Sequence, residues 1–153
     1  MDPRAQEMLE HGRRVLAQQP FSTLLGAELL AFAPGYAELR VAIKDELKQQ
    51  HGFVHGGVVS YLADNALTYA GGSVLLTGVV TSEYKINYVR PAVGRALIAR
   101  ATAAHTGRNQ AVCRCDVFVE SETGEQLCAI AQGTIVRLGE AKSASSGTSG
   151  ASE

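Results

Sequence analysis

The stretch between His51 and Gly72 holds the residues with the clearest chemical potential in the chain. From Val58 to Ala70 it contains one charged side chain, the carboxylate of Asp64. Burying an unpaired carboxylate is costly, so a lone acid in such a segment needs a partner or a chemical role. We therefore take Asp64 as a candidate catalytic group, with a solvated helix acid as the alternative.

The same stretch predicts a buried helix, because a surface helix carries a charged face and residues 58–70 are apolar nearly all round. Small and polar positions recur at spacings of 3, 4 and 4 and share one helix face: Gly57, Ser60, Asp64 and Thr68. Large and small apolar positions are then free to face a sheet: Val59, Leu62, Ala66 and Tyr69. The acid thus belongs to a polar stripe on an otherwise apolar helix.

His55, Gly56 and Gly57 fall at the expected N-terminus of this helix. Free backbone N–H groups and the helix dipole favour negative charge there, and glycine lets a ligand atom approach the amides closely. Such a terminus can stabilise the oxyanion of an acyl-transfer intermediate. Simple helix capping is the alternative role for these residues.

The spacing of these two features predicts how they could work together. Gly57 and Asp64 are seven positions apart in the sequence. That separation is roughly 10 Å along a helix, which is too far for one small reacting group. A two-fold dimer with antiparallel central helices would bring each Asp64 towards Gly56 and Gly57 of the other subunit. We therefore expect an obligate homodimer with two shared sites.

The remaining sequence predicts elements that could position this helix. Residues 1–19 are typical of an amphipathic helix ended by Pro20, and residues 139–153 of a flexible tail of small and polar residues. Alternating or β-rich patterns predict strands over 27–33, 36–43, 82–89, 95–104, 111–120 and 126–138. The chain thus divides into an N-terminal helix (1–19), one domain (20–138) and a tail (139–153).

Short polar turns predict how these strands pair. Pro34-Gly35, the stretch HTGRNQ before Ala111 and ETGEQ before the last strand are typical of hairpins. The expected order is helix, two strands, long helix and about four strands in hairpin succession. Such a sheet is antiparallel with one solvated face, and the long helix must cover the other. The fold class is α+β, with a curved antiparallel sheet around a central helix.

Composition excludes several classes of function. The formal net charge of −1 argues against nucleic-acid binding. No apolar run approaches the length of a membrane span, and the N-terminal stretch lacks the apolar core of a secretory signal. The three cysteines, Cys113, Cys115 and Cys128, lack metal-site spacing and are expected to be reduced core residues. We therefore expect a cytoplasmic protein with no metal site.

Three stretches together resemble hotdog-fold acyl-CoA thioesterases of the phenylacetate-pathway (PaaI-like) type: QQHGFVHGGVVSYLADNALTYA, TSEYKINYVRPA and TGRNQAVCRCDVFVESETGEQLCAIAQGTIVRL. They cover about residues 50–138. The pattern of His-Gly-Gly with an Asp nine positions after the His is the most specific part. The resemblance implies a hotdog fold, dimers that pair into tetramers, and hydrolysis of an acyl-CoA thioester without a further cofactor.

The resemblance also implies roles for particular residues. Asp64 would be the nucleophile or the general base acting on water, and the Gly57 amide, with Gly56 and His55, would polarise the thioester carbonyl. Thr81, or alternatively Ser82, matches a strand hydroxyl that places the water. Many members carry Asn where this chain has Gln49.

Substrate binding needs further groups. CoA phosphates require cations, and Arg90, Arg108 and Lys85 are candidates near strand ends. Tyr61 or Leu67 of the central helix could line the acyl pocket. Phenylacetyl-type, other aromatic, medium-chain and 3-hydroxyacyl groups all remain open.

Two other functions are compatible with this fold. A hotdog hydratase or dehydratase would use His55 as base together with Asp64. A non-catalytic acyl-CoA-binding module is the other alternative, although residues 1–19 offer at most one helix for DNA binding. Release of free CoA, hydration without a free thiol, and binding without turnover distinguish the three.

Overall fold

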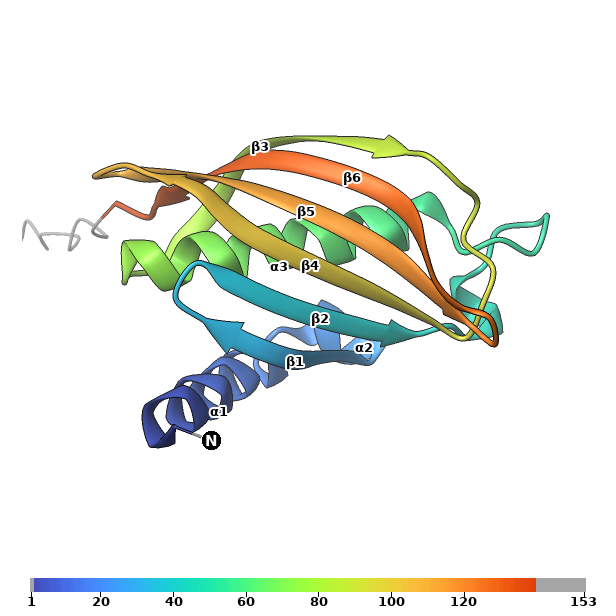
Figure 1. The fold of residues 1–153 in the computed structure, drawn as a ribbon, viewed down its shortest axis with the longest axis horizontal. Coiled ribbons are helices and arrows are strands. Elements are labelled where there is room, and N and C mark those ends of the chain that lie inside the picture. Colours follow the sequence, from blue (N-terminus) through green and yellow to red (C-terminus); the bar gives the residue numbers. More distant parts are fainter. Residues whose placement is uncertain (1, 140–153) are drawn as a thin grey trace, which may run out of the picture.

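The computed structural model describes residues 2–139 and shows an α+β fold (Figure 1). Its elements are α1 (Pro3–Ala17), α2 (Pro20–Leu25), β1 (Ala27–Ala33), β2 (Tyr36–Ala42), a 3-10 turn (Asp45–Leu47), α3 (Gly56–Leu75), β3 (Val79–Tyr88), β4 (Ala96–Thr106), β5 (Gln110–Ser121) and β6 (Gly124–Arg137). The expected tail lies, apart from Gly139, outside the described residues.

The N-terminal helix forms as expected, and a second helix that the sequence did not reveal follows it. Asp2 caps α1 by accepting a hydrogen bond from the Arg4 N–H at 3.1 Å. Pro20 does not only follow α1 but begins α2, because its fixed φ and missing N–H suit the first position of a helix. Gly26 ends α2 with a left-handed backbone conformation, which glycine adopts without strain.

The six strands form one antiparallel sheet in the order β1-β2-β4-β5-β6-β3. The expected hairpins β1–β2, β4–β5 and β5–β6 are confirmed, but the expected hairpin between β3 and β4 is wrong. β3 pairs with β6 instead, and residues 89–95 carry the chain to the other side of the sheet. No tight turn joins β3 to β4; the Val89 N–H bonds the Cys128 carbonyl at 2.9 Å, and Ala92 accepts from the Val54 N–H at 3.0 Å. β1 and β3 are therefore the two edges.

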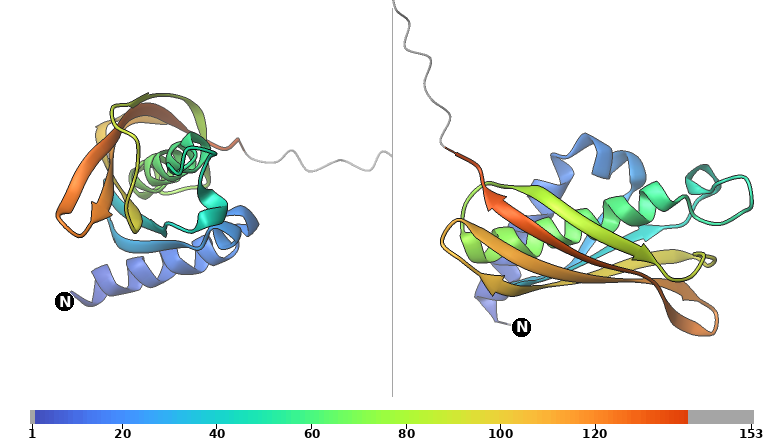
Figure 2. Two further views of the ribbon diagram at one scale, coloured as in Figure 1. Left: turned by 90° about the vertical axis from the view of Figure 1, so that its right-hand side faces the viewer. Right: turned by 90° about the horizontal axis from the view of Figure 1, so that it is seen from above.

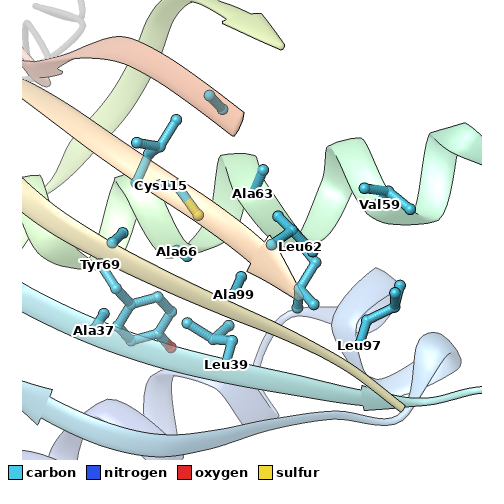
Figure 3. Packing of buried hydrophobic residues seen from close by; sticks show 14 of the residues in the cluster. Ala37, Leu39, Val59, Leu62, Ala63, Ala66, Tyr69, Leu97, Ala99 and Cys115 are labelled. Atoms are coloured by element: carbon cyan, nitrogen blue, oxygen red, sulfur yellow. The ribbon is translucent and has the colours of Figure 1, made fainter. Parts of the chain in front are cut away.

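The sheet curls around α3 (Figure 2), which explains why this helix is apolar on so many sides. The apolar face proposed from the sequence is confirmed: Val59, Leu62, Ala66 and Tyr69 are all buried against the strands (Figure 3). Late in the helix, Gly71 allows close approach, since a Cβ there would lie 2.6 Å from the Cβ of Ile135. The packing fixes which face of α3 is left for chemistry.

Helix α1 packs along β1 and is tied to α3 by one hydrogen bond. The Tyr69 hydroxyl donates to the Gly12 carbonyl at 2.9 Å, and Phe32 of β1 packs edge-on against the Tyr69 ring. All three cysteines are free and buried. In residues 2–139, no helix combines the length and apolarity that a membrane crossing requires.

Candidate active site

Asp64 is half-buried on α3, where one hydroxyl group bonds its carboxylate and another bonds its backbone carbonyl. The Thr81 hydroxyl of β3 donates to Asp64 Oδ1 at 2.6 Å. One turn further along α3, the Thr68 hydroxyl donates to the Asp64 backbone carbonyl at 2.9 Å and lies 3.0 Å from Thr81 Oγ1. Within residues 2–139, Asp64 Oδ2 accepts no hydrogen bond. The carboxylate is therefore anchored through one oxygen, and the other remains an acceptor.

An irregularity in β3 decides between the two candidate strand hydroxyls. Thr81 pairs with Ile135 and Glu83 with Thr134, so Ser82 is the extra residue of a bulge. In a regular strand Ser82 and Tyr84 would share one face, but the bulge shifts the register by one residue and separates them. Thr81 and Tyr84 both contact α3, whereas Ser82 is exposed.

The N-terminus of α3 differs from the expected arrangement in one hydrogen bond. His55 is the N-cap, and its Nδ1 accepts from the Gly57 N–H at 2.9 Å. The amide that we expected to polarise a carbonyl is therefore already engaged by the preceding histidine. In the part of the chain between Asp2 and Gly139, the Gly56 N–H has no hydrogen-bond acceptor, so the open donor at this helix terminus belongs to Gly56.

A cavity of about 350 Å³ opens at this helix terminus. Gln49, Gly56, Tyr88 and Arg90 are among its lining residues, and the Tyr88 hydroxyl donates to the Gly56 carbonyl at 3.1 Å. The Gln49 side chain accepts from the His51 N–H, so it is folded back onto its own loop. Three residues proposed from the sequence, Gln49, Gly56 and Arg90, are thus brought together.

The cavity and the carboxylate lie at different points along α3. Gly56 and Asp64 both belong to this helix, eight positions apart. At the rise of an α-helix, that spacing separates them by about 12 Å. Asp64 and Thr81 do not line the cavity. The chain therefore carries two separate groups of candidate residues, which we call half-sites: an amide with a cavity, and a carboxylate with a hydroxyl.

The other proposed residues lie outside both half-sites. Tyr61 faces α2, where its hydroxyl donates to Ser22 Oγ at 2.5 Å and accepts from Asn65 Nδ2 at 3.1 Å. Leu67 is completely buried in the core and lines no open surface, so its proposed place in an acyl pocket is wrong. Arg108 lies in the β4–β5 turn, near the start of β3 and far from Arg90.

Sequence reasoning gave no role in the site to three residues beside the half-sites: Thr68, Tyr84 and Tyr88. Thr68 could have been found, because it lies four positions after Asp64 on the polar stripe. The inward direction of Tyr84 depends on the bulge, and the position of Tyr88 depends on the crossover after β3. No group of three or more His, Cys, Asp or Glu side chains between residues 2 and 139 could hold a metal ion.

Comparison with known proteins agrees with this fold. Residues 51–126 match the model of the Thioesterase superfamily. A thioesterase family protein from Silicibacter pomeroyi is 33% identical, with a TM-score of 0.78 over 83% of this chain and 96% of that chain. A thioesterase from Haemophilus influenzae is 29% identical, with a TM-score of 0.73 over 84% and 88% of the two chains. The chain therefore belongs to the thioesterase superfamily, as a hotdog-fold, PaaI-like member, and is a thioester hydrolase.

The name of one relative states an activity. The acyl-coenzyme A thioesterase PaaI of Escherichia coli strain K12 is 28% identical over 116 residues, which are 75% of this chain and 80% of that one. The solved structure of the E. coli PaaI protein shares the fold, with a TM-score of 0.78 at 22% identity.

Proposed function

We propose that the protein hydrolyses an acyl-CoA thioester at two sites, each shared between the protomers of a homodimer. The proposal rests on the separation of about 12 Å between the open Gly56 amide and the anchored Asp64 carboxylate along one helix. Neither half-site is complete alone. Antiparallel α3 helices bring the Gly56 amide of one protomer to the partner's Asp64.

The edge strand β3 supports this pairing. Its free edge exposes backbone groups to a second strand, and the exposed apolar side chains of Val80, Tyr88 and Val89 lie on or just after it. An antiparallel β3–β3 pair would extend the sheet across both protomers. As the resemblance to PaaI-like thioesterases implies, two such dimers would form a homotetramer.

The two half-sites supply complementary parts of one reaction. The Gly56 N–H, at the positive end of the α3 dipole, stabilises negative charge that develops on the thioester carbonyl oxygen. Asp64 Oδ2 either attacks the carbonyl carbon directly or removes a proton from a water that attacks it. When water attacks, the C–S bond breaks to give the free acid, and the proton that Asp64 took from the water passes to the CoA sulfur. When Asp64 attacks, the C–S bond breaks to give a mixed anhydride on Asp64 and the CoA thiolate. A water then hydrolyses the anhydride, which releases the free acid, restores Asp64 and supplies the proton that the thiolate takes up.

Charged residues at the cavity support CoA as the leaving group. Arg90 lines the cavity beside Gly56 and is exposed, so it can meet a phosphate. Arg108 lies at the opposite end of β3, and only an antiparallel partner strand would bring the partner's Arg108 towards this cavity. The name of the E. coli relative supports acyl-CoA as the substrate class. The acyl group is proposed as phenylacetyl-type, other aromatic or medium-chain.

A substrate panel read by thiol release tests this function. The unsubstituted protein should release free CoA from at least one aromatic or medium-chain acyl-CoA, and Asp64→Asn should lower kcat by about 1,000-fold or more. Asp116→Asn is the matched control, because Asp116 is an exposed acid of β5 on the outside of the sheet. Hydration of an enoyl-CoA without a free thiol, or tight binding without turnover, would contradict the proposal.

A further inference from the structure

Ser60 and Tyr84 form a hydroxyl pair that the proposed reaction does not use. The Ser60 hydroxyl of α3 and the Tyr84 hydroxyl of β3 are hydrogen-bonded. Both residues are half-buried, and Ser60 lies on the polar stripe that also carries Asp64. This pair therefore lies on the same side of α3 as the carboxylate.

The half-sites on α3 locate the symmetry axis of the proposed dimer. When two identical helices pack antiparallel about a two-fold axis, the residue on the axis meets its own copy. Gly56 must lie opposite the partner's Asp64, so the axis crosses α3 halfway between residues 56 and 64. That position is Ser60.

The edge strand β3 locates the two-fold axis by a second, independent argument. β3 has ten residues, Val79–Tyr88, and its centre falls between Glu83 and Tyr84. An antiparallel pair that uses the whole free edge places the axis at this centre. The inward-facing residue there is Tyr84, which contacts Ser60. The helix spacing and the strand length therefore point to the same hydrogen bond.

We infer that the two-fold axis of the dimer passes beside the Ser60–Tyr84 pair and that the pairs of the two protomers form one hydroxyl cluster between the two active sites. The inference rests on the proposed function, because Gly56 and Asp64 define the helix register. Each hydroxyl can both donate and accept, so the four groups can satisfy one another when the partner excludes water.

The cluster would fix the register of the two subunits. Edge strands can slip along one another when their side chains do not specify an alignment. A slip would leave these hydroxyls buried without partners, which is unfavourable. Ser60 and Tyr84 are thus positioning residues, since they align Gly56 with the partner's Asp64 without touching the substrate.

Thiol cross-linking tests the position of the axis. Ser60→Cys places two thiols on neighbouring helices about 8–10 Å apart in the dimer. Residue 60 is only half-buried in the single chain, so a short homobifunctional maleimide added at a protein concentration where the subunits exchange can reach this thiol and join the two copies. Leu76→Cys is the control, because Leu76 is 86% exposed. It lies sixteen positions further along, so its two copies would be about 48 Å apart. The unsubstituted protein is the blank, since its three cysteines are buried. Of these three proteins, we expect only Ser60→Cys to give a covalent dimer.

The exposed face of β3 provides a second test that leaves the interior intact. Lys85 lies one position after Tyr84, and Val80 lies four positions before it. Both side chains are exposed. About an axis at Tyr84, the two copies of Lys85 are offset by about 7 Å along the strand and those of Val80 by about 26 Å. Lys85→Cys should cross-link and Val80→Cys should not. Cross-linking of Val80→Cys or Leu76→Cys in preference to the central positions would overturn the inference.

Dimer stability tests the role of the hydroxyls. Tyr84→Phe leaves Ser60 without its partner and should raise the dimer dissociation constant about tenfold, with loss of kcat/KM that is recovered at high protein concentration. Ser82→Ala, a hydroxyl removed from the exposed bulge, should change neither. An unchanged dissociation constant in Tyr84→Phe would refute the positioning role.

The inference and the proposed function can fail separately. If Ser60→Cys and Lys85→Cys cross-link but the protein releases no CoA, the proposed function is refuted and the position of the axis stands. CoA release that depends on Asp64, with cross-links away from residue 60, would refute the placement of the axis alone.

Discussion

The Thr81 hydroxyl donates to Asp64 Oδ1 at 2.6 Å and so joins the edge strand to the central helix. This contact orients the carboxylate through Oδ1, while Oδ2 accepts no hydrogen bond from residues 2–139. The bulge at Ser82 makes it possible, because it brings Thr81 to the inner face. A local irregularity of one strand thus sets the direction of the proposed reactive group.

Removing this hydroxyl should impair the reaction more than binding. Thr81→Val keeps the shape of the side chain but frees the carboxylate to rotate, and kcat should fall about 100-fold. KM should change little, because Thr81 does not line the cavity at Gly56. Steady-state kinetics of thiol release measure both values. Ser82→Ala is the control, and a greater loss from that variant would contradict the assignment.

Mixed dimers should restore activity that each parent variant lacks. Asp64→Asn removes the carboxylate half-site, and Gly56→Val blocks the amide half-site with a branched side chain beside Tyr88. In a mixed dimer, one site carries both substitutions and the other carries neither. Unfolding and refolding the two variants together at equal amounts should restore about a quarter of the normal activity.

The control for this experiment is refolding of each variant alone, which should stay inactive. Full activity of one variant alone, or no recovery in a mixture that size-exclusion chromatography shows to be dimeric, would rule out a site shared between protomers.

Two adjacent glycines in α3 should respond differently to alanine. A Cβ at Gly71 would lie 2.6 Å from the Cβ of Ile135, closer than side-chain atoms can pack. Gly71→Ala should therefore lower the free energy of unfolding by about 1–3 kcal/mol. At Gly72 the nearest atom is Val79 Cγ2 at 3.2 Å. The helix propensity of alanine offsets that milder contact, so Gly72→Ala should be nearly neutral. Urea unfolding followed by circular dichroism measures both.

The buried thiols should not react with a thiol reagent in the native protein. Burial raises the pKa of Cys113 and Cys128 to about 11 and, together with Asp116, raises the pKa of Cys115 to about 12. A thiol reagent at pH 8 should detect none of them before denaturation and three afterwards. Rapid labelling of the native protein would contradict this.

The same shifts predict a loss of stability at high pH. In the unfolded chain the thiols ionise near their ordinary pKa of 9.0, so the unfolded state releases its protons first as the pH rises. The thiol contribution is fully present below about pH 9 and is lost towards pH 11, by about 1.4 kcal/mol per pH unit for each thiol. Cys115→Val should flatten this decline in urea titrations at several pH values.

The sequence predicted the helix, its polar stripe and the neighbourhood of Gly56, because these depend on helical periodicity over a single segment. The sequence could not distinguish Thr81 from Ser82 as the hydroxyl beside Asp64, because a bulge is defined only by how a strand pairs with its neighbour. The position of β3 at the edge was missed for the same reason. Its pairing with β6 depends on contacts between residues about 50 positions apart, which no local pattern reports.

The engagement of the Gly57 amide shows a different limit. Sequence patterns locate a helix N-terminus, but they do not show which of its amides the capping side chain occupies. Here the His55 ring takes the Gly57 N–H and leaves that of Gly56. Helix α2 was missed because Pro20 is equally suited to ending one helix and beginning another.

The crossover after β3 has a consequence for the order of folding. Within residues 2–139, β3 joins the sheet only through β6, which is the last strand of that range. Such non-local pairing forms slowly, because a long loop must close before its contacts contribute. During synthesis, Asp64 and Thr81 both leave the ribosome well before the strand that holds β3 in place. We therefore expect a nascent chain that lacks residues 124–137 to keep both residues of the carboxylate half-site but not the contact between them.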